Sequence, residues 1–434
     1  MAPNALSRDD VLTYHLQGKI GLRLTKPLRS QRDLSLAYTP GVAQAVKAVA
    51  ADPGASFAYT ARANLVAVVS DGTAILGLGD LGALASVPVM EGKAVLFKAF
   101  GDVDGWPVPL AHCRGGGRDS GRTDPQRVID CVLALAPMYG GINLEDIAAP
   151  ACFEIEDRLD AMLDIPVFHD DQWGTAVITL AGLMNYARVT DRRLADLRVV
   201  VNGAGAAGIR IADMCKAAGV RDLVMCDSRG TLNDTRADLN EHKRRHAVRT
   251  PARTLAEAVR GAHVFIGVSA AGVLSGDDAR QMAGFPAIFA MANPDPEITP
   301  GAAAAAFGDK PFVMATGRSD YPNQINNVLG FPFIFRGALD ARARTINTAM
   351  KVAAAEALAA LARQPAPGEV RAVYPGERLE FGASYLIPKP FDRRLFVEVS
   401  HAVAAAAVAS GAAPAADLAA LRASLEARNA ARRG

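Results

Sequence analysis

Short apolar runs, separated by longer stretches of mixed character, organise the middle of the chain. Each run has the length and the apolar content of a buried strand. The runs are residues 64–70, 92–100, 165–168, 198–202, 223–227, 264–268, 287–291 and 312–316. Strands that alternate with helices predict a parallel sheet with helices on both faces. The pattern therefore predicts an α/β fold with a doubly wound parallel sheet.

The remaining pattern predicts helices and one irregular segment. Residues 101–125 are rich in Gly, Pro and charge, so we expect a loop or a weak edge strand there, followed by a helix over residues 125–138. A helix over residues 173–188 would connect one domain to the next. From residue 338 onward the chain is alanine-rich and helical, with an interruption by Pro and Gly around 365–390. Since 434 residues exceed one ordinary core, we expect two domains.

The charge balance and the cysteines limit the class of protein. Basic and acidic residues number 47 and 45, and the net charge of +2 gives no reason to expect a nucleic-acid or membrane partner. The cysteines are five in number and lack metal-type spacing, which indicates reduced thiols in a cytoplasmic protein. The N-terminus lacks the apolar core of a secretory signal, and the alanine run at 402–409 is too short to span a bilayer.

A glycine-rich loop follows the strand predicted at 198–202. The loop and the start of the next helix contain Gly203, Gly205, Ala206, Ala207 and Gly208. The three glycines form a GxGxxG pattern, which permits a tight turn, close approach of a pyrophosphate and close packing of the helix on the strand. The helix N-terminus also favours the charge of a phosphate. The pattern predicts a dinucleotide site in a Rossmann-type domain, and the alternative is a structural turn in a non-binding α/β domain.

The end of the next predicted strand carries residues that would meet an adenosine ribose. Asp227 lies 24 residues after Gly203, where an acid binds the ribose 2′-hydroxyl of NAD. Ser228 and Arg229 follow at once and could instead hold the 2′-phosphate of NADP. The sequence leaves NAD and NADP as open alternatives.

Two pairs of adjacent acids lie at the ends of apolar segments. Asp170 and Asp171 come just after the strand predicted at 165–168, and Glu145 and Asp146 form the second pair. Neighbouring like charges are costly to bury unpaired. Carboxylates are ligands for hard cations such as Mg²⁺ and Mn²⁺. A bound cation, a basic partner, or plain exposure at helix and strand ends would each account for the pairs.

Lys93 and Tyr38 are candidates for proton transfer. Lys93 precedes an apolar run, so its ammonium could be partly buried beside the acids. Burial or a nearby metal lowers the pKa of a lysine and lets it accept a proton. The alternative is a solvated surface lysine. Tyr38 is either a core tyrosine with a satisfied hydroxyl or a proton donor.

Several long motifs run in order along nearly the whole chain. They are TKPLRSQRDLSLAYTPGVA, NLVAVVSDGTAILGLGDLGALASVPVMEGKAVLFK, GGINLEDI, IPVFHDDQ, NGAGAAG, TGRSDYPNQINNVLGFPFIFRGALD and IPKPFD. Together they resemble the bacterial malic enzymes. The resemblance implies an N-terminal α/β catalytic domain over residues 1–172, a Rossmann-type NAD(P)-binding domain over 173–400 and a C-terminal helical segment over 401–434. Some relatives carry a phosphotransacetylase-like extension, and we expect none here.

The resemblance also implies an activity. This is the oxidative decarboxylation of (S)-malate to pyruvate and CO₂, with reduction of NAD⁺ or NADP⁺ and with Mg²⁺ or Mn²⁺ as the cation. By resemblance, Lys93 takes the proton of the C2 hydroxyl as hydride leaves for the nicotinamide. The oxaloacetate formed loses CO₂, and Tyr38 protonates C3 of the enol. The family also implies a homodimer or a higher homo-oligomer.

The family's other functional residues map onto positions of this chain. Its metal ligands match Glu145, Asp146 and Asp171. Asp170 matches an acid beside the lysine. The family's positions near the nicotinamide and the substrate match Asn293, Asn326 and its neighbour Asn327. The family's lysine also contacts the substrate, and it matches Lys93.

Two departures from the family's pattern keep other functions open. Family members commonly have His or Gln where this chain has Trp173, and we expect the larger indole to pack between the domains. The segment 101–125 does not follow the usual strand pattern. A metal-assisted 2-hydroxy-acid dehydrogenase without coupled decarboxylation is one alternative. A nucleotide-binding regulator with a decayed site is the other.

Overall fold

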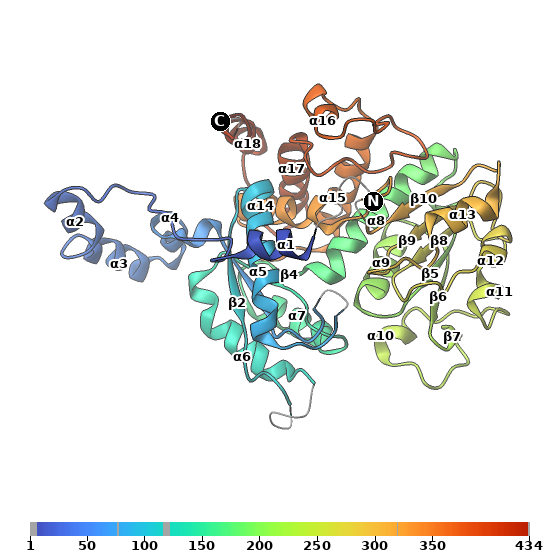
Figure 1. The fold of residues 1–434 in the computed structure, drawn as a ribbon. Coiled ribbons are helices and arrows are strands. Elements are labelled where there is room, and N and C mark those ends of the chain that lie inside the picture. Colours follow the sequence, from blue (N-terminus) through green and yellow to red (C-terminus); the bar gives the residue numbers. More distant parts are fainter. Residues whose placement is uncertain (1–6, 76–77, 116–121, 319, 433–434) are drawn as a thin grey trace.

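Two sheets and the long helix between them form the centre of the structure (Figure 1). The computed structural model describes residues 7–75, 78–115, 122–318 and 320–432. No described helix is both long enough and apolar enough to cross a lipid bilayer.

The first sheet has four strands, all parallel. They are β1 (Leu65–Ser70), β2 (Asp104–Pro109), β3 (Gly141–Leu144) and β4 (Val167–His169), in the order β2-β1-β3-β4. The strands predicted at 64–70 and 165–168 are therefore confirmed. β2 is the edge strand expected within residues 101–125, of which residues 116–121 lie outside the described part of the chain.

The strand predicted at 92–100 is wrong, because this run belongs to helix α5 (Ala83–Gly101). The run is apolar at almost every position, and such a run does not distinguish a strand from a buried helix. The residues that α5 buries recur every three or four positions, as on one face of a helix. They are Ser86, Met90, Lys93, Ala94, Phe97 and Gly101.

The second sheet has six strands and confirms the predicted doubly wound arrangement. They are β5 (Arg198–Asn202), β6 (Asp222–Asp227), β7 (Gly230–Thr231), β8 (Val264–Gly267), β9 (Ala287–Ala290) and β10 (Val313–Thr316). Their order is β10-β9-β8-β5-β6-β7, and all neighbours are parallel except the short edge strand β7, which is antiparallel to β6. The direction of winding reverses beside β5, which is the switch point where Rossmann-type sheets bind nucleotides.

Helices cover both faces of the second sheet. Val199 and Val201 of β5 belong to one apolar core, while Val200 between them belongs to another. On the first face lies α9 (Ala206–Ala217). The helices on the second face are α11 (Leu255–Val259), α12 (Gly276–Arg280) and α13 (Pro300–Phe307).

The helices predicted at 125–138 and 173–188 are confirmed. The first is α6 (Pro125–Leu135), extended by a 3-10 turn over Ala136–Met138. The second is α8 (Asp170–Val189), which starts directly after β4 and packs on α9. The shorter helices of the two α/β regions are α7 (Ala151–Met162) and α10 (Glu241–Arg244).

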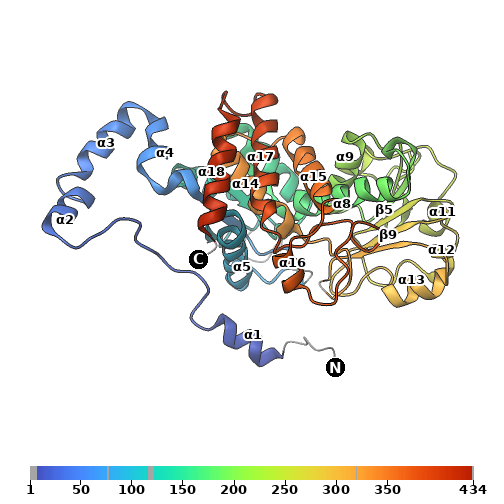
Figure 2. The same ribbon diagram turned by 90° about the horizontal axis from the view of Figure 1, so that it is seen from above.

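The C-terminal helices return to the first sheet. They are α14 (Phe331–Asp340), α15 (Thr348–Ala362), α16 (Gly368–Val373), α17 (Arg394–Ala409) and α18 (Leu418–Ala431). α14 packs on α5 and α17, and α15 packs on α8 (Figure 2). The predicted C-terminal helices are therefore present, and they lie against both halves of the molecule.

The N-terminal segment stands away from this body. Helix α1 (Arg8–His15) leads to Lys19, which touches α5 through its N–H and Glu91 Oε2, 3.0 Å apart. Residues 20–51, which we call the arm, then extend outward with α2 (Gln31–Ala37) and α3 (Val42–Ala51) (Figures 1 and 2). None of the residues of α2 and α3, all of which the structure describes, is buried. The chain re-enters the body through α4 (Ser56–Tyr59).

Candidate active site

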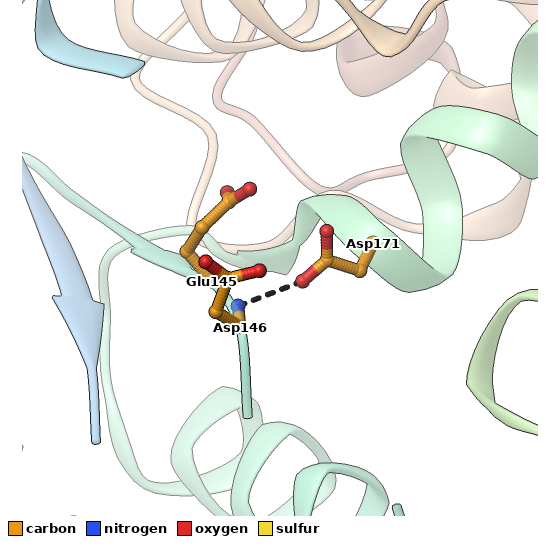
Figure 3. Close-up of side chains that lie close together, drawn as sticks. All are labelled: Glu145, Asp146 and Asp171. Atoms are coloured by element: carbon orange, nitrogen blue, oxygen red, sulfur yellow. Dashed lines mark hydrogen bonds between the residues drawn. The ribbon is translucent and has the colours of Figure 1, made fainter. Parts of the chain in front are cut away.

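The two acidic pairs meet at the carboxyl end of the first sheet. Glu145 and Asp146 follow β3, and Asp170 and Asp171 open α8 directly after β4. Because β3 and β4 are adjacent parallel strands, their carboxyl ends lie at the same edge. Figure 3 shows Glu145, Asp146 and Asp171 gathered there, and one carboxylate oxygen from each lies within 4.8 Å of the others.

An irregular backbone lets the acids of the first pair contribute to one cluster. Asp146 has a φ of 53°, in the left-handed region, and its N–H donates to Asp171 Oδ2 over 2.7 Å. The N–H of Glu145 donates to Val69 O over 2.9 Å, which ties the end of β3 to β1. Asn143 Nδ2 donates to Glu145 Oε2 over 2.9 Å. The result is a set of carboxylate oxygens of the kind that Mg²⁺ and Mn²⁺ prefer.

Lys93 projects from α5 into this cluster. Its ammonium is buried, and it lies 2.6 Å from Asp170 Oδ2 and 2.8 Å from Glu145 Oε1. The ammonium also lies 4.4 Å from the centre of the Phe331 ring. Asn327 Nδ2 donates to Asp170 Oδ2 over 2.6 Å. The alternative of a solvated surface lysine is therefore wrong, and the acidic pair at 170–171 has a basic partner.

Burial and crowding displace the pKa values of these groups. Burial raises the pKa of Glu145, Asp170 and Asp171 to about 7 each, although the charge of Lys93 opposes the rise. Burial lowers the pKa of Lys93, but the carboxylates of Asp170, Glu145 and Asp171 together raise it well above its usual range. With every group ionised, the four carboxylates of the two pairs face one ammonium, an excess of three negative charges. A divalent cation would offset two of them, so the residues fit such an ion.

The glycine loop has the geometry that a dinucleotide phosphate requires. Gly203 has a φ of +117°, and a Cβ on it would lie 2.5 Å from Val268 O. A Cβ on Gly208 would collide with Gly203 O, so this position needs glycine for close packing. Gly205 caps α9, which begins at Ala206, and no atom among the described residues lies within 4 Å of a Cβ placed on Gly205. The backbone there is open to the approach of a ligand.

Asp227, which is predicted to contact the adenosine ribose, forms hydrogen bonds with neighbouring residues. Asp227 ends β6 and accepts from Arg236 Nη1 and Nη2 over 2.8 and 3.1 Å and from Lys243 Nζ over 2.7 Å. Burial raises the pKa of Asp227, but these hydrogen bonds lower it to about 2. Arg229 donates its backbone N–H to Asp227 Oδ1 over 3.0 Å, while its side chain, like Ser228, is exposed.

The three asparagines occupy different places. Asn293 is exposed beyond the end of β9, close to Gly317, which follows β10. Asn326 caps a 3-10 turn, η5 (Asn327–Leu329), by accepting from the N–H of Val328 over 3.0 Å. Asn327 holds Asp170, so it is the asparagine of the three that contacts the acid and lysine cluster.

Tyr38 does not join the other predicted residues within one chain. It follows α2 in the arm, and it is 70% exposed. Figure 1 shows α2 and α3 well apart from β4 and the start of α8. The alternative of a core tyrosine is therefore wrong for this chain taken alone.

The sequence did not point to several residues that build the cluster. A Cβ on Gly174 would collide with Asp170 Oδ1 and lie 2.8 Å from Asn327 Cβ, so this glycine makes room for both side chains. A glycine inside an otherwise apolar helix was the signal that could have identified it. Asn143 and Phe331 gave no comparable signal, because ordinary strands and helices also contain such residues.

Trp173 packs between the two halves of the molecule, as expected. Its side chain is buried, and its Nε1 donates to Glu156 Oε1 over 2.8 Å. Arg210 of α9 and Lys351 of α15 lie over its rings, at 4.5 and 3.3 Å from a ring centre. The departure from the family's pattern therefore fills a place between α7, α9 and α15.

The fold and the cluster define a Rossmann-type α/β protein with a buried group of acids and a lysine. The model "Malic enzyme, N-terminal domain" matches residues 17–160, and the model "Malic enzyme, NAD binding domain" matches residues 173–379. The chain belongs to the malic enzyme family.

Individual relatives agree with this family. An NADP-dependent malic enzyme of Rhizobium meliloti is 54% identical over 98% of this chain and 56% of its own length. One of Halomonas elongata is 51% identical over 93% of this chain and 94% of its own length. The chain thus spans about half the length of some curated relatives. The crystal structure of a malic enzyme from Pyrococcus horikoshii matches with a TM-score of 0.85 and 38% identity, over 98% of this chain and 99% of that one.

Proposed function

We propose that this chain catalyses the oxidative decarboxylation of (S)-malate to pyruvate and CO₂, with reduction of NAD⁺ or NADP⁺ and with Mg²⁺ or Mn²⁺. The observation that carries the proposal is the ammonium of Lys93, buried between Asp170 and Glu145 beside the acids of the cluster. This geometry supports the proposal, because the neutral amine of Lys93 would be a proton acceptor beside carboxylates that would bind a cation, in a chain that also has a dinucleotide loop. The division into residues 1–172, 173–400 and 401–434 is part of the proposal.

The proposed roles follow from the contacts. Glu145, Asp146 and Asp171 would hold the cation, which when bound supplies Lewis-acid polarisation of the substrate's oxygens. Lys93 would take the proton of the C2 hydroxyl. Use of Glu145 as a ligand would remove one of the carboxylates that raise the pKa of Lys93, which favours the neutral amine that a base requires.

The neighbouring residues would orient this base and the substrate. Asp170 holds Lys93 and is itself held by Asn327, so it would fix the direction of the ammonium. Asn326 and Asn327 would contact the substrate, and Asn293 would lie near the nicotinamide. Trp173 gives no support to a decayed site, because its indole is part of a buried contact between helices.

We infer that the active unit is a homodimer in which the arm of one chain completes the site of the other. Tyr38 is the proposed donor to C3, yet it is 70% exposed in a segment that stands away from its own body. The arm also exposes apolar side chains that favour burial against a partner. They include Leu22 at 91%, Leu24 at 76% and Leu36 at 63% exposure. A second copy of the chain would bury these residues and bring Tyr38 to Lys93.

The first test of the function is turnover with its cation removed. Purified protein with (S)-malate, Mn²⁺ and NADP⁺ or NAD⁺ should form reduced nicotinamide and pyruvate in equal amounts. Chelation should stop both. Asp171→Ala should lower activity by more than about 100-fold, since loss of even an outer-shell partner of a metal site costs roughly 10–100-fold. Reduction without pyruvate would refute decarboxylation and favour a simple dehydrogenase. Asp164→Ala, which alters an exposed acid before β4, is the control.

We further propose that NADP⁺ is the preferred cofactor. A carboxylate has about four lone-pair sites, and Arg229, Arg236 and Lys243 supply Asp227 with four hydrogen bonds. Little capacity remains for a ribose hydroxyl. Arg229, Arg236 and Lys243 outnumber the acids Asp227 and Asp238 in this group, which leaves one net positive charge for a 2′-phosphate.

Within that group, Lys243 and Arg229 are the proposed phosphate contacts. The side-chain N–H groups of Arg236 donate hydrogen bonds to Asp227, Asp238 and the carbonyl oxygens of Gly230 and Thr231. Arg236 therefore fixes these groups in place and is not a proposed phosphate contact. Asp227 is the one hydrogen-bond acceptor of Lys243 Nζ among the described residues, so other protons of that ammonium stay available.

Lys243→Ala should therefore weaken NADP⁺ binding far more than NAD⁺ binding. Loss of one hydrogen bond to a charged group costs about 1.5–3 kcal/mol, or roughly 10–100-fold in Kd for NADP⁺. Calorimetric titration of both nucleotides measures the difference without turnover. Arg245→Ala is the control, because Arg245 is exposed and pairs with Glu241. Equal weakening of both nucleotides would refute the 2′-phosphate contact.

The proposed location is the cytoplasm. The proposal is supported by the five cysteines, which lie in the described part of the chain as free thiols, a state that a reducing compartment maintains.

A further inference from the structure

One buried carboxylate holds the stretch HDDQW, residues 169–173, at both ends. Oε1 of Glu156, on α7, accepts from the backbone N–H of His169 over 3.0 Å and from Trp173 Nε1 over 2.8 Å. These two donors flank Asp170 and Asp171 in the sequence. Glu156 is 5% exposed, so water does not compete for these bonds. The segment that presents the acidic pair is therefore fixed from outside the acid and lysine cluster.

Two cations complete the group around Glu156. Arg210 Nε donates to Gln172 Oε1 over 2.8 Å, and its Nη2 lies 3.5 Å from Glu156 Oε2. Lys351 lies on the ring of Trp173, also buried. Burial raises the pKa of Glu156, and the charges of Lys351 and Arg210 oppose this rise. We call Glu156, Trp173, Arg210 and Lys351 the interdomain cluster.

The interdomain cluster also reaches the nucleotide loop. Arg210 belongs to α9, whose first residue, Ala206, follows the open glycine of the loop. Through Gln172, Arg210 is bonded to the first turn of α8, which carries Asp171. One set of contacts thus joins the helix after the nucleotide loop to the helix whose first turn carries the proposed metal ligand, Asp171. Charged residues are not required merely to fill this space, because apolar side chains of similar volume often stabilise a core as well as a buried ion pair does.

We propose that Glu156 and Arg210 are positioning residues for the reaction. Glu156 sets the place of Asp171 relative to Glu145 and Asp146. Arg210 sets the place of the nucleotide helix relative to Asp171. This inference rests on the proposed function, because it takes Asp171 as a ligand. It assigns a role to residues outside the acid and lysine cluster, which would act on the reaction only through the positions of other residues.

The test compares Glu156→Ala with Glu156→Gln. Glutamine keeps an acceptor oxygen for His169 and Trp173, whereas alanine removes it. Glu156→Ala should raise the Kd for Mn²⁺ by about 10–100-fold, the usual cost of an outer-shell partner. Glu156→Gln should change it little. Both variants lose the buried carboxylate charge beside Arg210 and Lys351, so thermal stability should fall in both. Manganese binding, followed by electron paramagnetic resonance without malate, separates positioning from stability.

The controls distinguish this inference from the proposed function. Glu154→Ala removes an exposed acid from the same helix and should bind Mn²⁺ as the unaltered protein does. If the unaltered protein binds no Mn²⁺, the proposed function fails. If it binds Mn²⁺ and Glu156→Ala binds equally well, the positioning role is overturned. Equal weakening in Glu156→Gln and Glu156→Ala would also overturn it, because the charge and not the two hydrogen bonds would then matter.

If Glu156→Ala does not fold, a variant of Arg210 provides a second test of the proposal. Arg210→Lys keeps the positive charge but loses the guanidinium group, whose separate nitrogens reach Gln172 and Glu156 at the same time. It should raise the Kd of both Mn²⁺ and NADP⁺, by at least about 10-fold for the metal. Unchanged values for both ligands in a folded Arg210→Lys protein would overturn the proposal.

Discussion

Lys93→Ala is expected to lower kcat for malate turnover by about 10²–10⁴-fold, the usual contribution of a positioned acid or base. The ammonium of Lys93 is the buried basic group that lies within 2.8 Å of both Asp170 and Glu145. Alanine leaves no acceptor there for the proton of the substrate's hydroxyl. Nucleotide binding should stay within about threefold, because the glycine loop and the group at Asp227 lie on the other sheet.

Measuring metal binding shows whether Lys93→Ala loses activity because the base is missing or because the whole site is disrupted. Lys93 would compete with the proposed cation for Glu145, so its removal should leave the Kd for Mn²⁺ unchanged or lower. The measurement is kcat together with Mn²⁺ and NADP⁺ titrations. Lys98→Ala is the matched control, since Lys98 lies on the same helix with a side chain that is 57% exposed. Turnover at the normal rate in Lys93→Ala would exclude Lys93 as the base.

The sequence predicted the second sheet better than the surroundings of Lys93. Each strand of the second sheet except β7 is a short apolar run next to a turn residue, which is a local signal. β7 is two residues long and has no pattern of its own. The run at 92–100 was misassigned because both faces of α5 are apolar, and only the contact with β1, β2 and α14 decides between a helix and a strand.

The residues of the site also differ in this respect: some have a local signal in the sequence, and others depend on contacts with distant parts of the chain. Adjacent acids at the end of an apolar run are visible in the sequence, and the structure brings the two pairs together. Glu156 was not found, because its partners come from other elements, with His169 13 positions away and Arg210 54 positions away. A glutamate in an amphipathic helix is ordinary in sequence, and only the fold shows that this one is buried.

Tyr38 shows a different limit. The resemblance gave it the role of proton donor, and no property of one chain brings it to Lys93. In the proposed dimer another surface would cover Tyr38, and the exposed leucines of the arm would suit an apolar surface. The sequence signal for the proposed second copy would therefore be unburied apolar side chains and not a motif.

Co-expression of two inactive variants should therefore restore activity. Tyr38→Phe removes the proposed donor in the arm, and Lys93→Ala removes the proposed base in the body, so each homodimer should lose about 10²–10⁴-fold in kcat. In a mixed dimer with exchanged arms, the body with intact Lys93 receives the arm with intact Tyr38. One of the two sites is then complete. With random pairing, half of the dimers are mixed, so about one quarter of the full activity should return.

The control pair is Lys93→Ala with Asp171→Ala. Both changes lie in the body, so no exchange of arms creates a complete site, and activity should stay at the level of the single variants. Distinct affinity tags on the two chains isolate the mixed dimer, whose specific activity should be about half that of the unaltered dimer. An inactive mixed dimer of Tyr38→Phe and Lys93→Ala would refute the exchange, and Tyr38 would then have to act on its own chain. An active one places the two proton-transfer groups of each site on different chains, which makes the dimer the smallest unit able to complete the reaction.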